Sequence, residues 1–369
     1  MGTAARVRTC QWVAATVCAA LLAACSRALP PTPTTAVPLT ETRGPNGESP
    51  TASTTLTLTD GEVAHIRAGH FTVAFLWHTS SDFTVAAQAG AQDELMRLNV
   101  EVIATADAAF DPAKQRNDVE TVLAKKPNAM IALPLDPTMS AEAFRPAQRA
   151  AAKLVFLSNV PAGYKQGTDY VSIVTDDLFQ MGKQAADVLA DSIGGKGRVG
   201  WIYHDAANYV TNQRDKAFKT TIQKDYPNIQ IAAEQGIAEP AQAEAAATAM
   251  FTQTPDLDGV YVTFAEPAEH VLAALRTIGN TRTKLVTLDL SEPLALDMVL
   301  GGNVVGIVAD QAYELGRTMA DAVGYGLLGK QAPAFVVVPA FTVTRNNISQ
   351  GWQQSLHRDP PASVVSAGQ

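Results

Sequence analysis

The sequence predicts an α/β protein with two successive units, each a parallel β-sheet covered by helices on both faces. Three observations support this fold class. Short runs rich in Val, Ile and Leu, beginning at residues 71–77 (FTVAFLW), alternate with helix-like stretches. The alternation restarts at residues 197–203 (GRVGWIY). The hydrophobic fraction of 47% and the charged fraction of 17% fit a globular protein with a substantial core.

The remaining strands follow in order along the chain. In the first unit they are expected at residues 100–105, 129–135 and 153–159, with amphipathic helices at residues 86–99 and 141–152. In the second unit we expect strands at residues 229–235, 258–264, 283–290 and 303–310. Two doubly wound sheets place ligands at the carboxyl ends of their strands, so a cleft between the units is the predicted site.

The N-terminus predicts export. Arg6 and Arg8 precede an apolar run that ends at Leu22-Ala23-Ala24-Cys25. The run is shorter than the roughly 20 apolar residues of a membrane-spanning helix. Because Leu-Ala-Ala-Cys resembles the bacterial lipobox, residues 1–24 are predicted to be a signal peptide and Cys25 a lipidated membrane anchor. The alternative is an ordinary signal peptide with an incidental cysteine.

Both ends of the mature chain are predicted to be disordered. Residues 25–69 are rich in Pro, Thr, Ser and Gly for most of their length and are expected to form a tether, and residues 353–369 a tail. The other cysteines, Cys10 and Cys18, lie in the predicted signal peptide, so the body would have no disulfide.

Composition and motifs argue against several functions. The net charge of −8 and the lack of a basic block disfavour nucleic-acid binding. GKGRVG, residues 195–200, precedes a strand instead of following one, so it is interpreted as a turn that ends a helix. His78 and His204 both end strands and could meet across the cleft, but the histidines lack metal-ligand spacing. No cofactor and no enzymatic activity are expected.

The body, about Phe71 to Ile348, resembles the type I periplasmic binding proteins, especially the ribose-binding branch of sugar-transport receptors. The similarity lies in the serial order of residues 73–103, residues 170–189 (YVSIVTDDLFQMGKQAADVL) and residues 285–323. It implies two Rossmann-like lobes joined by three crossovers, near residues 173–175, 308–311 and 338–341. The implied lobes are residues 70–174 plus 310–339 for lobe 1 and residues 175–309 plus 340–352 for lobe 2. The related repressors carry an N-terminal helix-turn-helix, whereas this chain has the lipobox-like segment there.

The resemblance implies ligand-binding residues in lobe 1. Phe83 matches an aromatic that stacks on the sugar, and Ser81 lies in the same loop; packing of Phe83 in the core is the alternative. Asp136 matches a loop that borders the cleft, although a turn role is equally compatible. Ser158-Asn159 stands where ribose receptors have an Asp-Arg pair, which argues against ribose and leaves Asn159 as the contact.

Lobe 2 supplies the other residues that the resemblance implies. Arg214 matches a cleft arginine, with Tyr209 in the preceding loop; a surface pair with Asp215 is the alternative for Arg214. Asp289 matches a hydroxyl-binding aspartate, and its alternative role is to cap the following helix. Glu266 and Asp310 complete the predicted site, which is rich in acceptors.

The resulting prediction is a lipid-anchored receptor at the outer face of the bacterial cytoplasmic membrane. It would bind a small polyhydroxylated ligand, a sugar or polyol, by hinge closure and deliver it to the membrane permease of an ABC importer. It is expected to be a monomer. The alternatives are a ligand-sensing lipoprotein of a signalling system and a receptor for a non-sugar amine or an autoinducer-type molecule. A hydrolase is disfavoured because no nucleophile–base arrangement is found.

Overall fold

The computed structural model describes residues 41–368. The predicted signal peptide and Cys25 lie outside these residues. Within the described range, no helix has the length and apolar character needed to cross a membrane.

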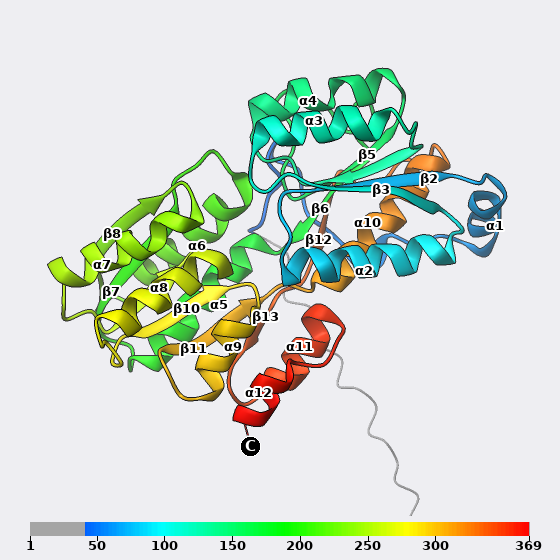
Figure 1. Ribbon diagram of the computed structural model, residues 1–369. Helices are drawn as coiled ribbons and strands as arrows, with labels where there is room; N and C mark the ends of the chain where they lie inside the picture. The colour runs from blue at the N-terminus through cyan, green and yellow to red at the C-terminus, as the bar shows by residue number, and fades with distance from the viewer. Residues whose placement is uncertain (1–40, 369) are drawn as a thin grey trace, which may run out of the picture. The chain divides into compact units, whose positions relative to one another are not determined.

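The first sheet has seven parallel strands within the described residues, in the spatial order β1-β12-β6-β5-β4-β2-β3. Its inner strands are almost entirely buried and apolar because helices cover both faces. Helices α2 and α10 lie on one face and α3 and α4 on the other (Figure 1). The strands are β1 (Thr51–Ala52), β2 (Thr72–Trp77), β3 (Glu101–Asp107), β4 (Ala129–Ala132), β5 (Lys153–Leu157), β6 (Ser172–Asp176) and β12 (Phe335–Val338); the helices are α1 (Asp60–Ala68), α2 (Asp82–Arg97), α3 (Pro112–Leu123), α4 (Pro137–Arg149) and α10 (Ala312–Leu327).

The second sheet has six strands among the described residues, in the spatial order β13-β11-β10-β9-β7-β8. All its pairs are parallel except β13 with β11, which is antiparallel. Helices α5 and α6 pack on one face and α7, α8 and α9 on the other (Figure 1). The strands are β7 (Gly197–His204), β8 (Ile229–Ile237), β9 (Gly259–Val262), β10 (Lys284–Leu288), β11 (Val304–Ala309) and β13 (Phe341–Val343); the helices are α5 (Leu178–Ser192), α6 (Tyr209–Asp225), α7 (Ala243–Gln253), α8 (Ala265–Thr277) and α9 (Glu292–Val299).

The chain passes between the two sheets three times. It leaves the first sheet after β6 and enters α5, which packs on the second sheet. It returns between β11 and α10, through Asp310 and Gln311, and crosses again between β12 and β13. Because β6 continues to Asp176 in the first sheet, the first passage lies two residues beyond the predicted lobe boundary.

The prediction of a disordered tether is wrong for residues 41–69. Strand β1 adds to the edge of the first sheet beside β12, and a short 3-10 helix, η1 (Ser53–Thr55), follows it. Helix α1 starts at a capping box formed by Thr59 and Glu62. Ile66, in α1, is fully buried in the core beside α2 and α10. The error has a physical reason: a few apolar residues suffice here because an existing sheet edge supplies the backbone partners.

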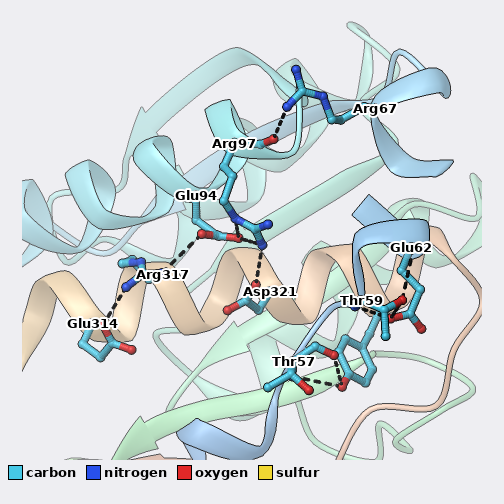
Figure 2. Close-up of polar contacts among 10 residues, drawn as sticks. Thr57, Thr59, Glu62, Arg67, Glu94, Arg97, Glu314, Arg317 and Asp321 are labelled. Atoms are coloured by element: carbon cyan, nitrogen blue, oxygen red, sulfur yellow. Dashed lines mark hydrogen bonds and ion pairs between the residues drawn. The ribbon is translucent and has the colours of Figure 1, made fainter. Parts of the chain in front are cut away.

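Polar contacts fix this segment and the two helices next to it (Figure 2). Tyr325 on α10 donates its hydroxyl to the Thr57 carbonyl at 3.0 Å. Between α2 and α10, the buried Glu94 carboxylate accepts a hydrogen bond from Arg97 Nε at 2.7 Å and lies 3.5 Å from Arg317 Nη2. Since Glu94 is only 2% exposed, this pairing compensates for the cost of burying its charge.

The prediction of a disordered C-terminal tail is also wrong. Residues 353–369 include the end of helix α11 (Ile348–Leu356) and helix α12 (Ala362–Ala367). Trp352, Leu356 and Val364 are buried in the same core as α7, α8 and α9. The two prolines at positions 360 and 361 favoured disorder in the sequence, but they only separate the two helices. Val364 sits on a helix too short to show periodicity, so its burial depends on α9.

Candidate functional site

A cavity of about 640 Å³ is lined by residues from both sheets and from the passages between them. Its walls come from the carboxyl ends of the strands and the loops that follow them, notably after β2, β4 and β5 in the first sheet and after β7, β9 and β10 in the second. Parallel α/β sheets bind ligands at these ends because the loops converge there and helix N-termini point into them.

Most residues predicted for the site line this cavity. They are Ser81, Phe83, Asp136, Asn159, Arg214, Glu266, Asp289 and Asp310. His78 and His204 line it as well. Within residues 41–368, no group of three or more His, Cys, Asp or Glu side chains is arranged to hold a metal ion.

Tyr209 is the exception, because it is not among the lining residues, and its role in binding stays a prediction. Helix α6 directs Val210, Thr211 and Arg214 at the cavity, and residues three and four apart share one helix face. Burial, together with the negative charge of Glu48, raises the pKa of the Tyr209 hydroxyl to about 12.

An ion pair between Arg214 and Asp289 lies in the lobe 2 wall of the cavity. Arg214 Nη1 donates to Asp289 Oδ1 at 3.1 Å, and the side chains are 6% and 18% exposed. Arg214 Nε is buried and has no partner among the described residues. Helix α6 can approach α5 closely because of Gly182, where an added Cβ would lie 2.1 Å from the Arg214 carbonyl oxygen.

Asp289 follows β10 with a φ of +67°, in the left-handed region that non-glycine residues seldom adopt. Such strain costs about 1–3 kcal/mol and persists only where the surroundings enforce it. The structure gives Asp289 no capping bond to α9, whose first residue is Glu292, so the alternative role of helix cap is not supported. The strained turn instead places the carboxylate beside Arg214 at the cavity wall.

Two further carboxyls lie where the chain passes between the sheets. Asp176 and Asp310 are 4% and 2% exposed, and both line the cavity. Ser355 Oγ, on α11, donates to Asp310 Oδ1 at 3.3 Å, whereas Asp176 Oδ1 has no partner within residues 41–368. Burial, and next the charge of Asp289, raise the pKa of Asp176 to about 8 and that of Asp310 well above its usual range.

Asp176 lines the cavity but is not among the residues that the sequence predicted for the site. Its position carries one readable signal: in VSIVTDD, an acidic residue ends an apolar strand at a predicted crossover. What the sequence could not provide is the neighbour at that point, because Asp289 and Arg214 follow on other elements much later in the chain.

Aromatic rings form an apolar wall on the lobe 1 side. The His78 ring lies edge-on to Phe83 and Phe110, with centroids 6.4 Å and 5.3 Å away. Burial lowers the pKa of His78 to about 4, so this ring is neutral near pH 7. Phe83 is half-buried, packs against the core and lines the cavity, so the core position does not exclude the predicted contact with a ligand. The rings offer a face against which the C–H groups of a ligand can pack.

The polar groups of lobe 1 are held by backbone contacts. Ser81 and Asp136 cap α2 and α4, and Asp136 Oδ1 accepts from Met139 N at 2.7 Å. The turn role and the cavity-lining role of Asp136 are therefore compatible. Asn159 donates its Nδ2 to the Pro134 carbonyl at 3.0 Å, which fixes the amide, and its buried Oδ1 has no partner in the described chain. Asn159 thus presents a free acceptor.

The buried acids predict that the ligand-free protein becomes more stable as the pH falls from 8 to about 6. Burial raises the pKa of Asp176 to about 8 and the pKa of Glu266 to about 7. In this pH range both carboxyls therefore keep protons in the folded state that they release near pH 4 in the unfolded chain. Raising the pH through this window therefore lowers the free energy of unfolding, by about 1–3 kcal/mol. His78 and His204, whose pKa burial lowers, oppose the trend as the pH falls through about 6.5, where the unfolded imidazoles take up protons.

Melting temperatures at pH 6 and pH 8 measure this effect. The variant Asp176→Asn should be more stable than the wild type at pH 8 and should show a smaller difference between the two pH values. Asp225→Asn, at an exposed position outside the cavity, is the control. A melting temperature that is higher at pH 8 than at pH 6 in the wild type would contradict the assignment of protonated acids.

Solved structures share this fold. An ABC transporter solute-binding protein from Agrobacterium vitis, bound with α-D-tagatopyranose, superimposes with a TM-score of 0.71 at 21% identity, covering 78% of this chain and 99% of that one. One from Mycobacterium smegmatis with bound glycerol gives 0.69 at 24% identity, with the same coverages. A third, from Bacillus halodurans with bound myo-inositol, gives 0.66 at 16% identity, with 76% and 97% coverage. A comparison with curated proteins found no match.

The two doubly wound parallel sheets and the chain passages between them confirm the predicted fold class. The sequence profile described as the periplasmic binding protein domain matches residues 73–331, which is more than half of the chain and includes most of both sheets. The chain belongs to the periplasmic binding protein domain family.

Proposed function

We propose that this protein is a receptor that captures a small polyhydroxylated ligand, a sugar or a polyol, between its two lobes and delivers it to an ABC importer. The observation that carries the proposal is the cavity itself: both sheets line it, and it contains the buried Arg214–Asp289 pair. The titles of the similar structures, with tagatopyranose, glycerol and myo-inositol bound, support the same ligand class.

The chemistry of the walls suits hydroxyl groups, which both donate and accept hydrogen bonds. Arg214 Nε is a buried donor without a partner, and Asn159 Oδ1 and Asp176 Oδ1 are buried acceptors without partners among the described residues. An unpaired buried polar atom costs about 1–3 kcal/mol, so a ligand that pairs these atoms gains both affinity and specificity. Phe83 supplies apolar contact to the ring carbons.

Ligand capture would proceed by bending at the passages between the sheets. A ligand that touches Asn159 on one side and Arg214 on the other binds the closed arrangement more tightly than an open one. Only that difference in affinity can shift the equilibrium between the two. The passages at Asp176 and Asp310 lie directly at the cavity, so ligand contact and hinge geometry are coupled there.

The cellular setting completes the proposal. Membership of the family implies an exported protein. In this proposal Cys25 carries a lipid that anchors the protein to the outer face of the bacterial cytoplasmic membrane, where the closed monomer docks on a permease. Mass spectrometry of the mature protein tests the anchor, because the chain should begin with an acylated Cys25.

Binding measurements test the receptor function. A thermal-shift screen of pentoses, hexoses and polyols should identify ligands, because a bound ligand raises stability by mass action. Asp289→Ala should then weaken affinity at least tenfold, since it removes a charged acceptor and the partner of Arg214. Asp225→Ala, exposed and outside the cavity, should leave affinity unchanged. Equal affinity of Asp289→Ala and the wild type, measured by titration calorimetry, would show that the cavity is wrongly assigned.

A further inference from the structure

The cavity has more acidic side chains than a neutral sugar requires. Among the described residues, nine of those that line it are Asp or Glu, whereas Arg214 is the one Arg or Lys. Some of these acids have partners elsewhere: Asp82 pairs with Arg358, and Asp136 caps α4. Of the others, Asp176 and Asp310 lie where the chain passes between the sheets, and the charge of Asp289 acts on both.

Three carboxyls surround the single guanidinium at the most buried part of the cavity. Arg214 pairs with Asp289, and its charge also acts on Asp176 and Asp310. The one positive charge of Arg214 can offset the negative charge of only one of these three carboxylates. Asp176 is 4% exposed, and its Oδ1 lacks a partner within residues 41–368 although the residue lines the cavity. A buried carboxylate in this state requires either a proton or a cation.

Resting on the function proposed above, we propose that the ligand carries an ammonium group in addition to its hydroxyls, as an amino sugar or an amino polyol does, and that Asp176 together with Asp310 binds that group. An ammonium group has three N–H donors and no acceptor, which matches carboxylate oxygens. It also supplies the positive charge that the cavity lacks. Charge-assisted hydrogen bonds of this kind are roughly twice as strong as neutral ones.

Asp289 and Arg214 would take the hydroxyls instead. The guanidinium of Arg214 repels a second cation, so the ammonium group should lie nearest the carboxyl that does not pair with it. Asp289 already accepts from Arg214 Nη1. Asp176 makes no such bond through Oδ1. Asp176 is therefore the carboxyl expected to lie nearest the ammonium group.

Proton release follows from this arrangement. Burial and the charge of Asp289 raise the pKa of Asp176 to about 8 and the pKa of Asp310 well above its usual range, so Asp176 holds a proton near neutral pH when no ligand is bound. The charged groups that act on Asp176 are Asp289, Arg214 and Asp177. When an ammonium group enters, the carboxyls ionise and their protons leave to solvent. A neutral sugar provides no charge to drive that step.

The test uses matched pairs of compounds that differ by one ammonium group in place of a hydroxyl: D-glucosamine with D-glucose, D-galactosamine with D-galactose, and D-glucamine with D-sorbitol. Titration calorimetry at pH 7.5, on the protein from residue 26 onward, should show at least tenfold tighter binding of the amine in at least one pair. Repeating the titration in two buffers of different ionisation enthalpy should reveal proton release for the amine alone.

The variant Asp176→Asn assigns the effect to a residue. It should reduce the amine preference, which is the ratio of the two affinities within a pair, below threefold, whereas Asp225→Asn should leave that ratio unchanged. A preference that persists in Asp176→Asn would overturn the role of Asp176.

The wild-type comparison decides the ligand class without any variant. Neutral members that bind as tightly as the amines, or more tightly, would overturn the inference and leave the proposed sugar receptor intact. A lack of binding by both members of every pair would overturn the inference, and a further lack of binding to all pentoses, hexoses and polyols would also overturn the proposed function.

Discussion

Replacing Arg214 with alanine should weaken the affinity for hydroxylated ligands at least a hundredfold. Arg214 is the single Arg or Lys that lines the cavity among the described residues, and its side chain is 6% exposed. Its removal takes away a donor in a desolvated site and leaves the carboxyls of Asp289, Asp176 and Asp310 without a counter-charge. Breaking a buried pair by removing one partner costs about 3–5 kcal/mol, so the variant should also melt at a lower temperature.

Two further variants separate charge from geometry. Arg214→Lys keeps the positive charge but loses the planar set of donors, so its affinity should fall between those of the wild type and Arg214→Ala. Arg149→Ala, at an exposed position outside the cavity, should bind as the wild type does. Unchanged affinity of Arg214→Ala in titration calorimetry would show that the Arg214–Asp289 pair only supports the fold.

Replacing Trp352 with alanine should lower the free energy of unfolding by about 3–5 kcal/mol. Trp352 is fully buried on α11, where it joins the core formed by α7, α8 and α9. Its removal leaves a large cavity in this core. Urea unfolding followed by circular dichroism measures the change without relying on tryptophan fluorescence.

The matched control is Gln354→Ala, on the exposed side of the same helix. It should change the urea midpoint little, because exposed substitutions are usually within about 0.5 kcal/mol. A loss below 1 kcal/mol in Trp352→Ala would contradict the view that the C-terminal helices are part of the folded body. Deletion of residues 347–369 should then be tolerated as well, whereas we expect it to prevent stable folding.

Periodicity was sufficient to predict the body of the fold. The buried strands β2, β4, β5, β9 and β10 are continuous apolar runs, which a strand covered on both faces requires, and such runs are visible in the sequence. The ends of the chain were not predictable in the same way. β1 is two residues long and α12 six, so neither shows a period, and both fold because an edge strand or helix is already present.

For the candidate site, too, some features were predictable from the sequence and others were not. The sequence by itself placed Phe83, Asn159, Arg214 and Asp289 after strands, and parallel topology brings such positions to one end of each sheet. The sequence did not determine which side chains reach the cavity: Val210 and Arg214 line it, whereas Tyr209 is not among the lining residues. Only the tertiary structure showed that Asp176 lies buried near Asp289 and Arg214, because the charge environment of a residue depends on segments far along the chain. Local sequence sets the elements, whereas burial and mutual charge arise only when the elements meet.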